Sequence, residues 1–146
     1  MLKKNLSVIK INLQRNIKLQ KASNLNLFNG IGRFNKKLNK YEKRDWYEVL
    51  LTIPKSITGK TVYPKGSFTA YTLDGFTIAM KTSGDYNKNF TSAHDQKIFG
   101  KWIKGKLEKA KSLKKGEIVT DKTLNKYGNK YLVLTRIDKK NYIMNF

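Results

Sequence analysis

Residues 21–44 form the stretch with the most recognition chemistry. Asparagines recur there between basic residues: Asn24, Asn26, Asn29, Asn35 and Asn39. Gly30 and Gly32 flank Ile31, and glycine permits close approach of a backbone. An asparagine amide pairs with adenine, an arginine pairs with guanine, and lysines hold phosphates. The stretch has no periodicity, so we expect a long loop that contacts nucleic acid, although turn chemistry alone also produces asparagine-rich loops.

A second polar stretch, residues 82–89, precedes the clearest helix of the chain. Ser92 followed by Asp95 predicts a helix N-cap with an acidic third residue. An apolar stripe follows at helical spacing: Phe99, Trp102, Ile103, Leu107 and Ala110. The opposite face is expected to carry Lys97, Lys101, Lys104, Lys106 and Lys109. Gly100 and Gly105 each lower the stability of the helix by about 1 kcal/mol relative to alanine. Their presence predicts that the helix packs closely against a sheet, or against phosphates at Gly105. We expect this helix to support the loop at a surface for a polyanion.

The charge of the chain is strongly one-sided. Its 146 residues include 31 Lys or Arg and 10 Asp or Glu, a net charge of +21. Residues 1–44 contain twelve Lys or Arg and one acid, Glu42. Such an excess repels itself unless a polyanion neutralises it, and nucleic-acid phosphates are the commonest such partner. An AT-rich genome also adds lysine and asparagine, but it would add acidic residues too.

The length suits one domain, residues 1–146, with residues 1–6 expected to be disordered. The sequence has no cysteine and no apolar run of transmembrane length. It lacks the apolar region of a signal peptide after its start. We therefore expect an intracellular, cytoplasmic protein of a bacterium or a phage.

Alternating apolar residues predict most of the strands. Residues 8–19 place Ile9, Ile11, Leu13, Ile17 and Leu19 on one face, unless they form an unstructured basic leader. Residues 45–54 predict a strong strand. Residues 67–72 and 75–81 predict a hairpin around Asp74-Gly75, with Phe76, Ile78 and Met80 toward the core.

The C-terminal third predicts a short helix and a last hairpin. Thr120 is expected to cap the helix, Leu124 and Tyr127 to point inward, and Gly128 to end it. Residues 130–138 and 141–146 predict the hairpin. The whole pattern, six or seven strands with one long and one short helix, indicates an α+β, mostly β fold: an antiparallel, partly closed barrel or curved sheet.

The residue types give little support to catalysis. His94 is the single histidine, so a nucleophile–histidine pair would depend on it alone. The acids are scattered, and Glu48 with Asp85 is the one pair that could meet at a metal-dependent nuclease site. No phosphate-binding glycine motif occurs. We expect no cofactor, no metal and no enzyme activity in this chain.

Three segments resemble a known family: residues 21–33, residues 45–54 and residues 81–128. They are similar to the C-terminal target-recognition domain of phospholipase-D-type restriction endonucleases, such as the NgoFVII-type enzymes. That domain resembles the plant B-three type DNA-binding pseudobarrel and the N-terminal domain of EcoRII. The resemblance spans about residues 7–146 and implies a seven-stranded open pseudobarrel whose two arms read duplex DNA in the major groove.

Carried onto this chain, the resemblance implies two arms and a set of phosphate contacts. The first arm would contribute Asn24, Asn26, Asn29 and Arg33. The second arm would contribute Lys81, Thr82, Ser83, Asp85, Tyr86, Asn87, Lys88 and Asn89. Phosphates would be held by Lys36, Lys37, Lys40, Lys43, Lys101 and Lys104. The chain departs from the family at Phe28, where an aromatic such as Trp is common, and in the insert that follows Arg33.

The sequence therefore predicts a non-catalytic, sequence-specific double-stranded DNA-binding domain of a restriction system. The family's nuclease half is absent from this sequence, so we expect a detached domain, a fragment or a stand-alone protein, with a phospholipase-D-type nuclease as a candidate partner. Two alternatives stay open. One is general binding of RNA or single strands, with Tyr41, Tyr86, Tyr127 and Tyr131 as stacking candidates. The other is a restriction endonuclease subunit that itself cleaves DNA.

Overall fold

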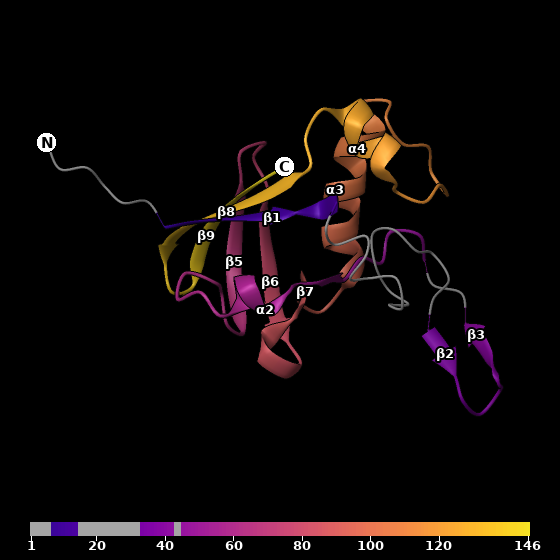
Figure 1. The fold of residues 1–146 in the computed structure, drawn as a ribbon, viewed down its shortest axis with the longest axis horizontal. Helices are drawn as coiled ribbons and strands as arrows, with labels where there is room; N and C mark the ends of the chain where they lie inside the picture. Colours follow the sequence, from indigo (N-terminus) through magenta and orange to yellow (C-terminus); the bar gives the residue numbers. More distant parts are fainter. Residues whose placement is uncertain (1–6, 15–32, 43–44) are drawn as a thin grey trace, which may run out of the picture.

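The computed structural model describes residues 7–14, 33–42 and 45–146. Its main feature is a curved seven-stranded sheet that forms an open half-barrel (Figure 1). The strand order is β1 (Val8–Asn12), β8 (Tyr131–Asp138), β9 (Asn141–Asn145), β5 (Ser67–Thr72), β6 (Thr77–Ser83), β7 (Asn89–Ser92) and β4 (Leu51–Thr52). The predicted open pseudobarrel is confirmed. The expected antiparallel pairing is wrong for one pair of strands, because β9 runs parallel to β5.

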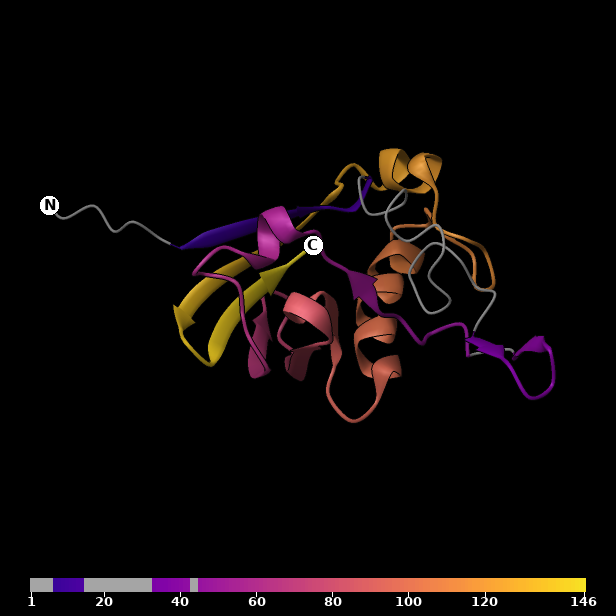
Figure 2. The same cartoon turned by 60° about the horizontal axis from the view of Figure 1, so that its bottom comes forward.

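The helix predicted behind the second polar stretch is α3 (Gln96–Lys109), and Figure 2 shows it lying beside β6 and β7. Phe99, Trp102, Ile103 and Leu107 are buried as predicted, whereas Ala110 is exposed. The N-cap is Asp95, whose carboxylate accepts a hydrogen bond from the backbone N–H of Lys97. Ser92 instead ends β7, and its hydroxyl accepts from the backbone N–H of Phe99 at 2.9 Å, which ties the strand to the helix.

The C-terminal predictions are confirmed in detail. Thr120 caps α4 (Asp121–Tyr127) through a capping box with Thr123. Leu124 is buried, and the hydroxyl of Tyr127 donates to the carbonyl of Phe146 at 2.9 Å. Gly128 ends the helix with a left-handed backbone (φ 88°), as glycine does best. Strands β8 and β9 then pair as the expected hairpin.

The N-terminal half departs more from the sequence predictions. In residues 45–54 only Leu51–Thr52 pairs, with β7, because the backbone turns at Asp45, whose carbonyl accepts from the N–H of Glu48. Val49, Leu51 and Ile53 are nonetheless all buried, which is the alternation expected of a strand with one face toward the core.

Four elements were not anticipated. A separate hairpin, β2 (Arg33–Asn35) and β3 (Lys40–Glu42), lies inside the predicted loop. Strand β7 (Asn89–Ser92) lies at the end of the second polar stretch. The short helix α2 (Lys55–Thr58) lies in residues 55–66, the connecting segment between two of the predicted strands.

The β5–β6 hairpin forms around Asp74-Gly75 as predicted, but Phe76 is 57% exposed rather than in the core. It precedes the first paired residue of β6, Thr77, so it belongs to the turn. Strand β1 confirms Ile9 and Ile11 as buried positions, and Leu13 is buried just beyond it. The predictions for residues 1–6, Ile17 and Leu19 lie outside the described residues.

Candidate nucleic-acid interface

The loop between β6 and β7, residues 84–88, has an unusual backbone. It forms a 3₁₀ turn, η1 (Asp85–Asn87), in which Tyr86 has φ 44° and Asn87 has φ 57°. Gly84 also has a positive φ, and a Cβ there would lie 2.6 Å from the side-chain nitrogen of Asn89. Left-handed backbone at a bulky residue is costly and occurs mainly where the surroundings enforce it, often at functional sites.

Hydrogen bonds from the connecting segment enforce this conformation. The hydroxyl of Tyr63 donates to the carbonyl of Asn87 at 2.7 Å, and the N–H of Ile53 donates to the carbonyl of Lys88 at 2.8 Å. The hydroxyl of Thr82 accepts from the N–H of Gly66 at 2.8 Å and lies 3.0 Å from the carbonyl of Pro64, to which it donates. Thr82, expected to contact a ligand, is therefore buried and supports the loop from inside.

The loop presents an aromatic ring with two lysine ammonium groups near it. Tyr86 is 45% exposed, and the Nζ atoms of Lys55 and Lys88 lie 4.9 and 5.9 Å from its ring centroid. Lys81 and Asp85 are exposed beside it. An ammonium group over an aromatic face is electrostatically favourable. The arrangement can thus offer a flat apolar surface to a sugar or base and two positive charges to flanking phosphates.

Only part of the first arm can be placed. Asn24, Asn26, Asn29 and Lys43 lie outside the described residues, and Arg33 is placed by its backbone at the start of β2. Lys36, Lys37 and Lys40 are exposed on the β2–β3 hairpin. Figures 1 and 2 show this hairpin standing off from the half-barrel. The two views thus place three predicted phosphate contacts on a projecting element.

Lys104 is buried, and its predicted position on the exposed face of α3 is wrong. It is 3% exposed, its ammonium donates to the carbonyl of Trp46 at 2.6 Å, and it lies 4.2 Å from the Trp46 ring centroid. Burial lowers its pKa to about 8. Lys104 follows Gly100 by one helical turn, so the two share a face. A Cβ at Gly100 would lie 1.5 Å from the carbonyl oxygen of Tyr47, so this is the face that packs on residues 46–49.

Lys101 has a different setting from Lys104. It is exposed and lines a groove of about 540 Å³ between α3 and the β5–β6 turn, together with Phe76, Ile98 and Trp102. Trp102 closes the groove on one side, and its indole N–H donates to the carboxylate of Asp74 at 3.1 Å. The predicted phosphate contact of Lys101 therefore belongs to a largely apolar surface.

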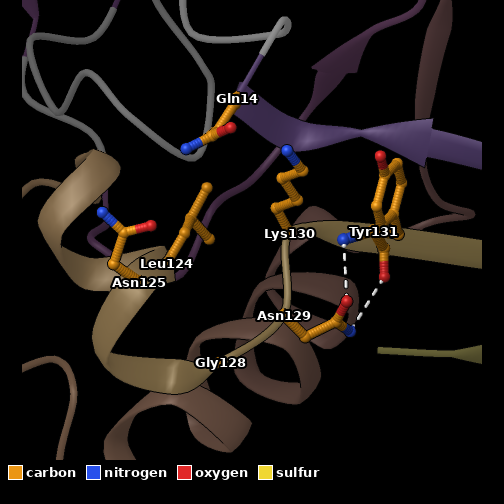
Figure 3. A pocket seen from close by; sticks show the side chains of 7 residues that line it. All are labelled: Gln14, Leu124, Asn125, Gly128, Asn129, Lys130 and Tyr131. Atoms are coloured by element: carbon orange, nitrogen blue, oxygen red, sulfur yellow. Dashed lines mark hydrogen bonds between the residues drawn. The ribbon is translucent and has the colours of Figure 1, made fainter.

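A polar pocket of about 370 Å³ lies where β1 ends, lined among others by Gln14, Asn125, Asn129 and Lys130 (Figure 3). The amide of Asn129 donates to the carbonyl of Tyr131 and accepts from its N–H, at 3.1 and 3.0 Å. These bonds hold the entry into β8. Gln14 is the last described residue before position 33.

Sequence reasoning missed Lys55, which reaches the Tyr86 ring of the β6–β7 loop from α2. The available signal was the recurrence of lysine at every fifth position of the connecting segment, Lys55, Lys60 and Lys65. Among the described residues, no three His, Cys, Asp or Glu side chains gather in a way that could hold a metal ion. No helix in that part of the chain is long and apolar enough to span a membrane.

Comparison with known families completes the description of the site. The family model of the NgoFVII C-terminal B3-like DNA-binding domain matches residues 1–138. The chain belongs to this family. The match confirms the resemblance derived from the sequence, and it makes this chain a B3-like DNA-binding domain of a restriction enzyme. The matched region includes both predicted arms and every strand of the half-barrel except β9. A comparison with curated proteins gives no significant match.

Proposed function

We propose that this B3-like domain recognises a specific sequence in double-stranded DNA on behalf of a restriction system, and that two arms enter the major groove. The observation that supports this most is the braced β6–β7 loop, which holds Tyr86 exposed with the ammonium groups of Lys55 and Lys88 at 4.9 and 5.9 Å from its ring centroid. A loop fixed in a strained conformation is preorganised, so little conformational entropy is lost when it binds.

The contact set follows from exposure and position. The second arm contributes Lys81, Ser83, Asp85, Tyr86, Asn87, Lys88 and Asn89, with Lys55 added from α2. Thr82 and Lys104 are left out, because both side chains are buried and hydrogen-bonded within the protein. The first arm contributes Asn24, Asn26, Asn29 and Arg33, followed by Lys36, Lys37, Lys40 and Lys43 as phosphate contacts.

We further propose that cleavage belongs to a separate nuclease domain or subunit of the phospholipase-D type. The described residues offer no cluster of metal-binding side chains. Magnesium-dependent cleavage of a plasmid by this chain, abolished by Asp85→Asn, would contradict this part of the proposal. Since the ligand is duplex DNA, the proposal places the protein in the cytoplasm of a bacterial or phage-infected cell.

Selection of bound duplexes from a random pool tests the proposal. We expect one short motif to be enriched, because base contacts from two arms discriminate by about 1–3 kcal/mol per good bidentate pair. A parallel selection from a single-stranded pool serves as the control. Enrichment of single strands alone, or of no motif at all, would contradict sequence-specific duplex recognition.

A further inference from the structure

A second cationic feature lies outside both arms. A pocket of about 260 Å³ forms between the connecting segment and the β8–β9 turn, and its lining includes Tyr63, Lys65, Arg136, Lys139, Lys140 and Tyr142. Four of these side chains are cationic, and no acidic side chain lines the pocket. A concave site with several cations and no acid is suited to an oxyanion such as phosphate.

The neighbouring acid, Asp138, does not line the pocket, although its charge interacts with that of Arg136. Asp138 precedes the lysine pair, and its carboxylate accepts hydrogen bonds from the N–H of Lys140 and the amide of Asn141, at 2.8 and 2.9 Å. These bonds hold the turn. They also fix the backbone from which Lys139 and Lys140 extend, so the two ammonium groups start from a defined position.

The pocket is joined to the second arm through its tyrosines. Tyr63 and Tyr142 are buried. The Tyr142 hydroxyl donates to the carbonyl of Val62, and the Tyr63 hydroxyl donates to the carbonyl of Asn87 in the β6–β7 loop. The same short segment therefore supports both the loop and the pocket.

Two of the cationic side chains, Arg136 and Lys140, each make a long hydrogen bond to a backbone carbonyl. A guanidinium nitrogen of Arg136 lies 3.4 Å from the carbonyl of Thr61, and the ammonium of Lys140 lies 3.4 Å from the carbonyl of Ser67. A guanidinium has five N–H donors and an ammonium has three, so each long bond occupies one donor. The groups are positioned near the pocket while keeping further donors for an anion.

We propose that this pocket binds a backbone phosphate of the duplex beside the second arm, which makes the β8–β9 turn a third contact element. The inference rests on the proposed function, since the arm orients the DNA that supplies the phosphate. A phosphate contact positions the duplex without reading its sequence, so the pocket contributes affinity and register but no base preference.

The test is the double variant Lys139→Ala/Lys140→Ala against the matched control Lys122→Ala/Lys126→Ala. The control pair removes the same charge from exposed positions on α4, which both ribbon views place away from the β8–β9 turn. We expect the pocket variant to weaken binding of selected and scrambled duplexes by the same factor. It should also reduce the slope of log affinity against log salt by about 0.9, the value for one lost phosphate contact. The control should leave the slope unchanged, and thermal unfolding should show that both variants are folded.

The outcomes separate this inference from the proposed function. If the wild-type chain binds no duplex, the proposed function fails. If the wild type binds and the pocket variant has the slope of the control, only the inference fails. Titration with inorganic phosphate, followed by amide NMR shifts at residues 139–142, distinguishes the two sources of the anion: we expect duplex to displace phosphate, and simultaneous binding of both would overturn the assignment to DNA.

Discussion

Tyr86 combines a left-handed backbone with an exposed ring, and this combination yields a prediction. The Tyr86→Gly variant loses two lysine–ring contacts, each worth about 0.5–1 kcal/mol. It also loses the backbone strain of a left-handed tyrosine, about 1–2 kcal/mol, so the two effects on stability offset each other. We expect the free energy of unfolding to stay within about 1 kcal/mol of wild type. Duplex affinity should fall by at least about 1 kcal/mol, as for a tyrosine at the centre of an interface. Calorimetric unfolding and fluorescence anisotropy measure the two quantities.

Phe76→Ala is the control for Tyr86, because Phe76 is an exposed aromatic that precedes β6, whereas Tyr86 follows the end of that strand. It should leave duplex affinity unchanged. A Tyr86→Gly variant that binds like wild type but unfolds more easily would show a structural role for the ring.

For Arg33, in the predicted first arm, a base contact and a phosphate contact can be distinguished by experiment. If it pairs with a guanine, Arg33→Ala should cost about 1–3 kcal/mol and relax specificity at one position of the selected site. Binding to a panel of singly substituted duplexes measures this. An equal loss on every sequence would instead identify Arg33 as a phosphate contact.

The buried Lys104 should make the free energy of unfolding of the chain depend on pH. Burial lowers its pKa to about 8 in the folded chain from an ordinary value of 10.5. Between these values the unfolded chain binds more protons than the folded chain, so the free energy of unfolding rises with pH, by at most about 1.4 kcal/mol per unit. Below pH 8 Lys104 is charged in both states, and the cost of burying its charge is present in full.

Lys104→Met removes this titration. The free energy of unfolding of the wild type minus that of Lys104→Met should therefore rise from about pH 8 to about pH 9.5. This range stays below the ordinary tyrosine pKa of about 10, so it avoids the titration of ordinary tyrosines. Urea unfolding at several pH values gives the difference. A difference that is flat over this range would contradict a lowered pKa of Lys104.

At the scale of elements, α3 contains two glycines with opposite roles. A Cβ at Gly100 would overlap the carbonyl of Tyr47, whereas a Cβ at Gly105 has no neighbour within 4 Å. Gly100→Ala should destabilise the chain by about 3 kcal/mol or fail to fold, as severe overpacking does. Gly105→Ala should stabilise it by about 1 kcal/mol through helix propensity. Thermal unfolding measures the change in stability of both variants. Equal changes at the two positions would contradict the close approach of α3 to residues 46–49.

The elements also show which features a sequence can predict. The α3 stripe, the α4 capping box and the two hairpins are set by residues close together in the chain, so periodicity and turn chemistry predict them. Lys104 was placed wrongly because its burial depends on Trp46, 58 positions away. Strand β4 is shorter than predicted because the turn at Asp45 and pairing with β7 decide its length.

In the candidate site, too, features set by neighbouring residues were predictable from the sequence and features set by distant residues were not. Composition indicates a polar loop before the helix, and the family resemblance implies an arm at residues 81–89. The bracing by Tyr63 and Gly66 was not predicted, because it comes from the connecting segment. The pocket beside the arm was missed for the same reason, because it combines Lys65 with a turn more than 70 positions later. Residues 15–32 lie outside the described part of the chain, so the asparagines of the first arm stay a prediction.

For the whole molecule, the net charge of +21 sets the background against which any specific binding is measured. A chain this basic attracts every polyanion, and such binding is sequence-independent and falls steeply with salt. Charge alone therefore cannot distinguish a DNA-recognition domain from a general nucleic-acid binder. The distinguishing quantity is the ratio of affinities for the selected duplex and for a scrambled duplex of the same composition.

That ratio is the most direct test of sequence-specific duplex recognition. Equilibrium binding of the wild-type chain to the selected duplex, the scrambled duplex and one separated strand should be measured at about 0.15 M salt, where screening is physiological. We expect the selected duplex to bind at least about 10³-fold more tightly than the scrambled one, and the single strand to bind no better than the scrambled duplex. Equal affinity for the two duplexes, or tighter binding of the single strand, would contradict sequence-specific recognition of double-stranded DNA.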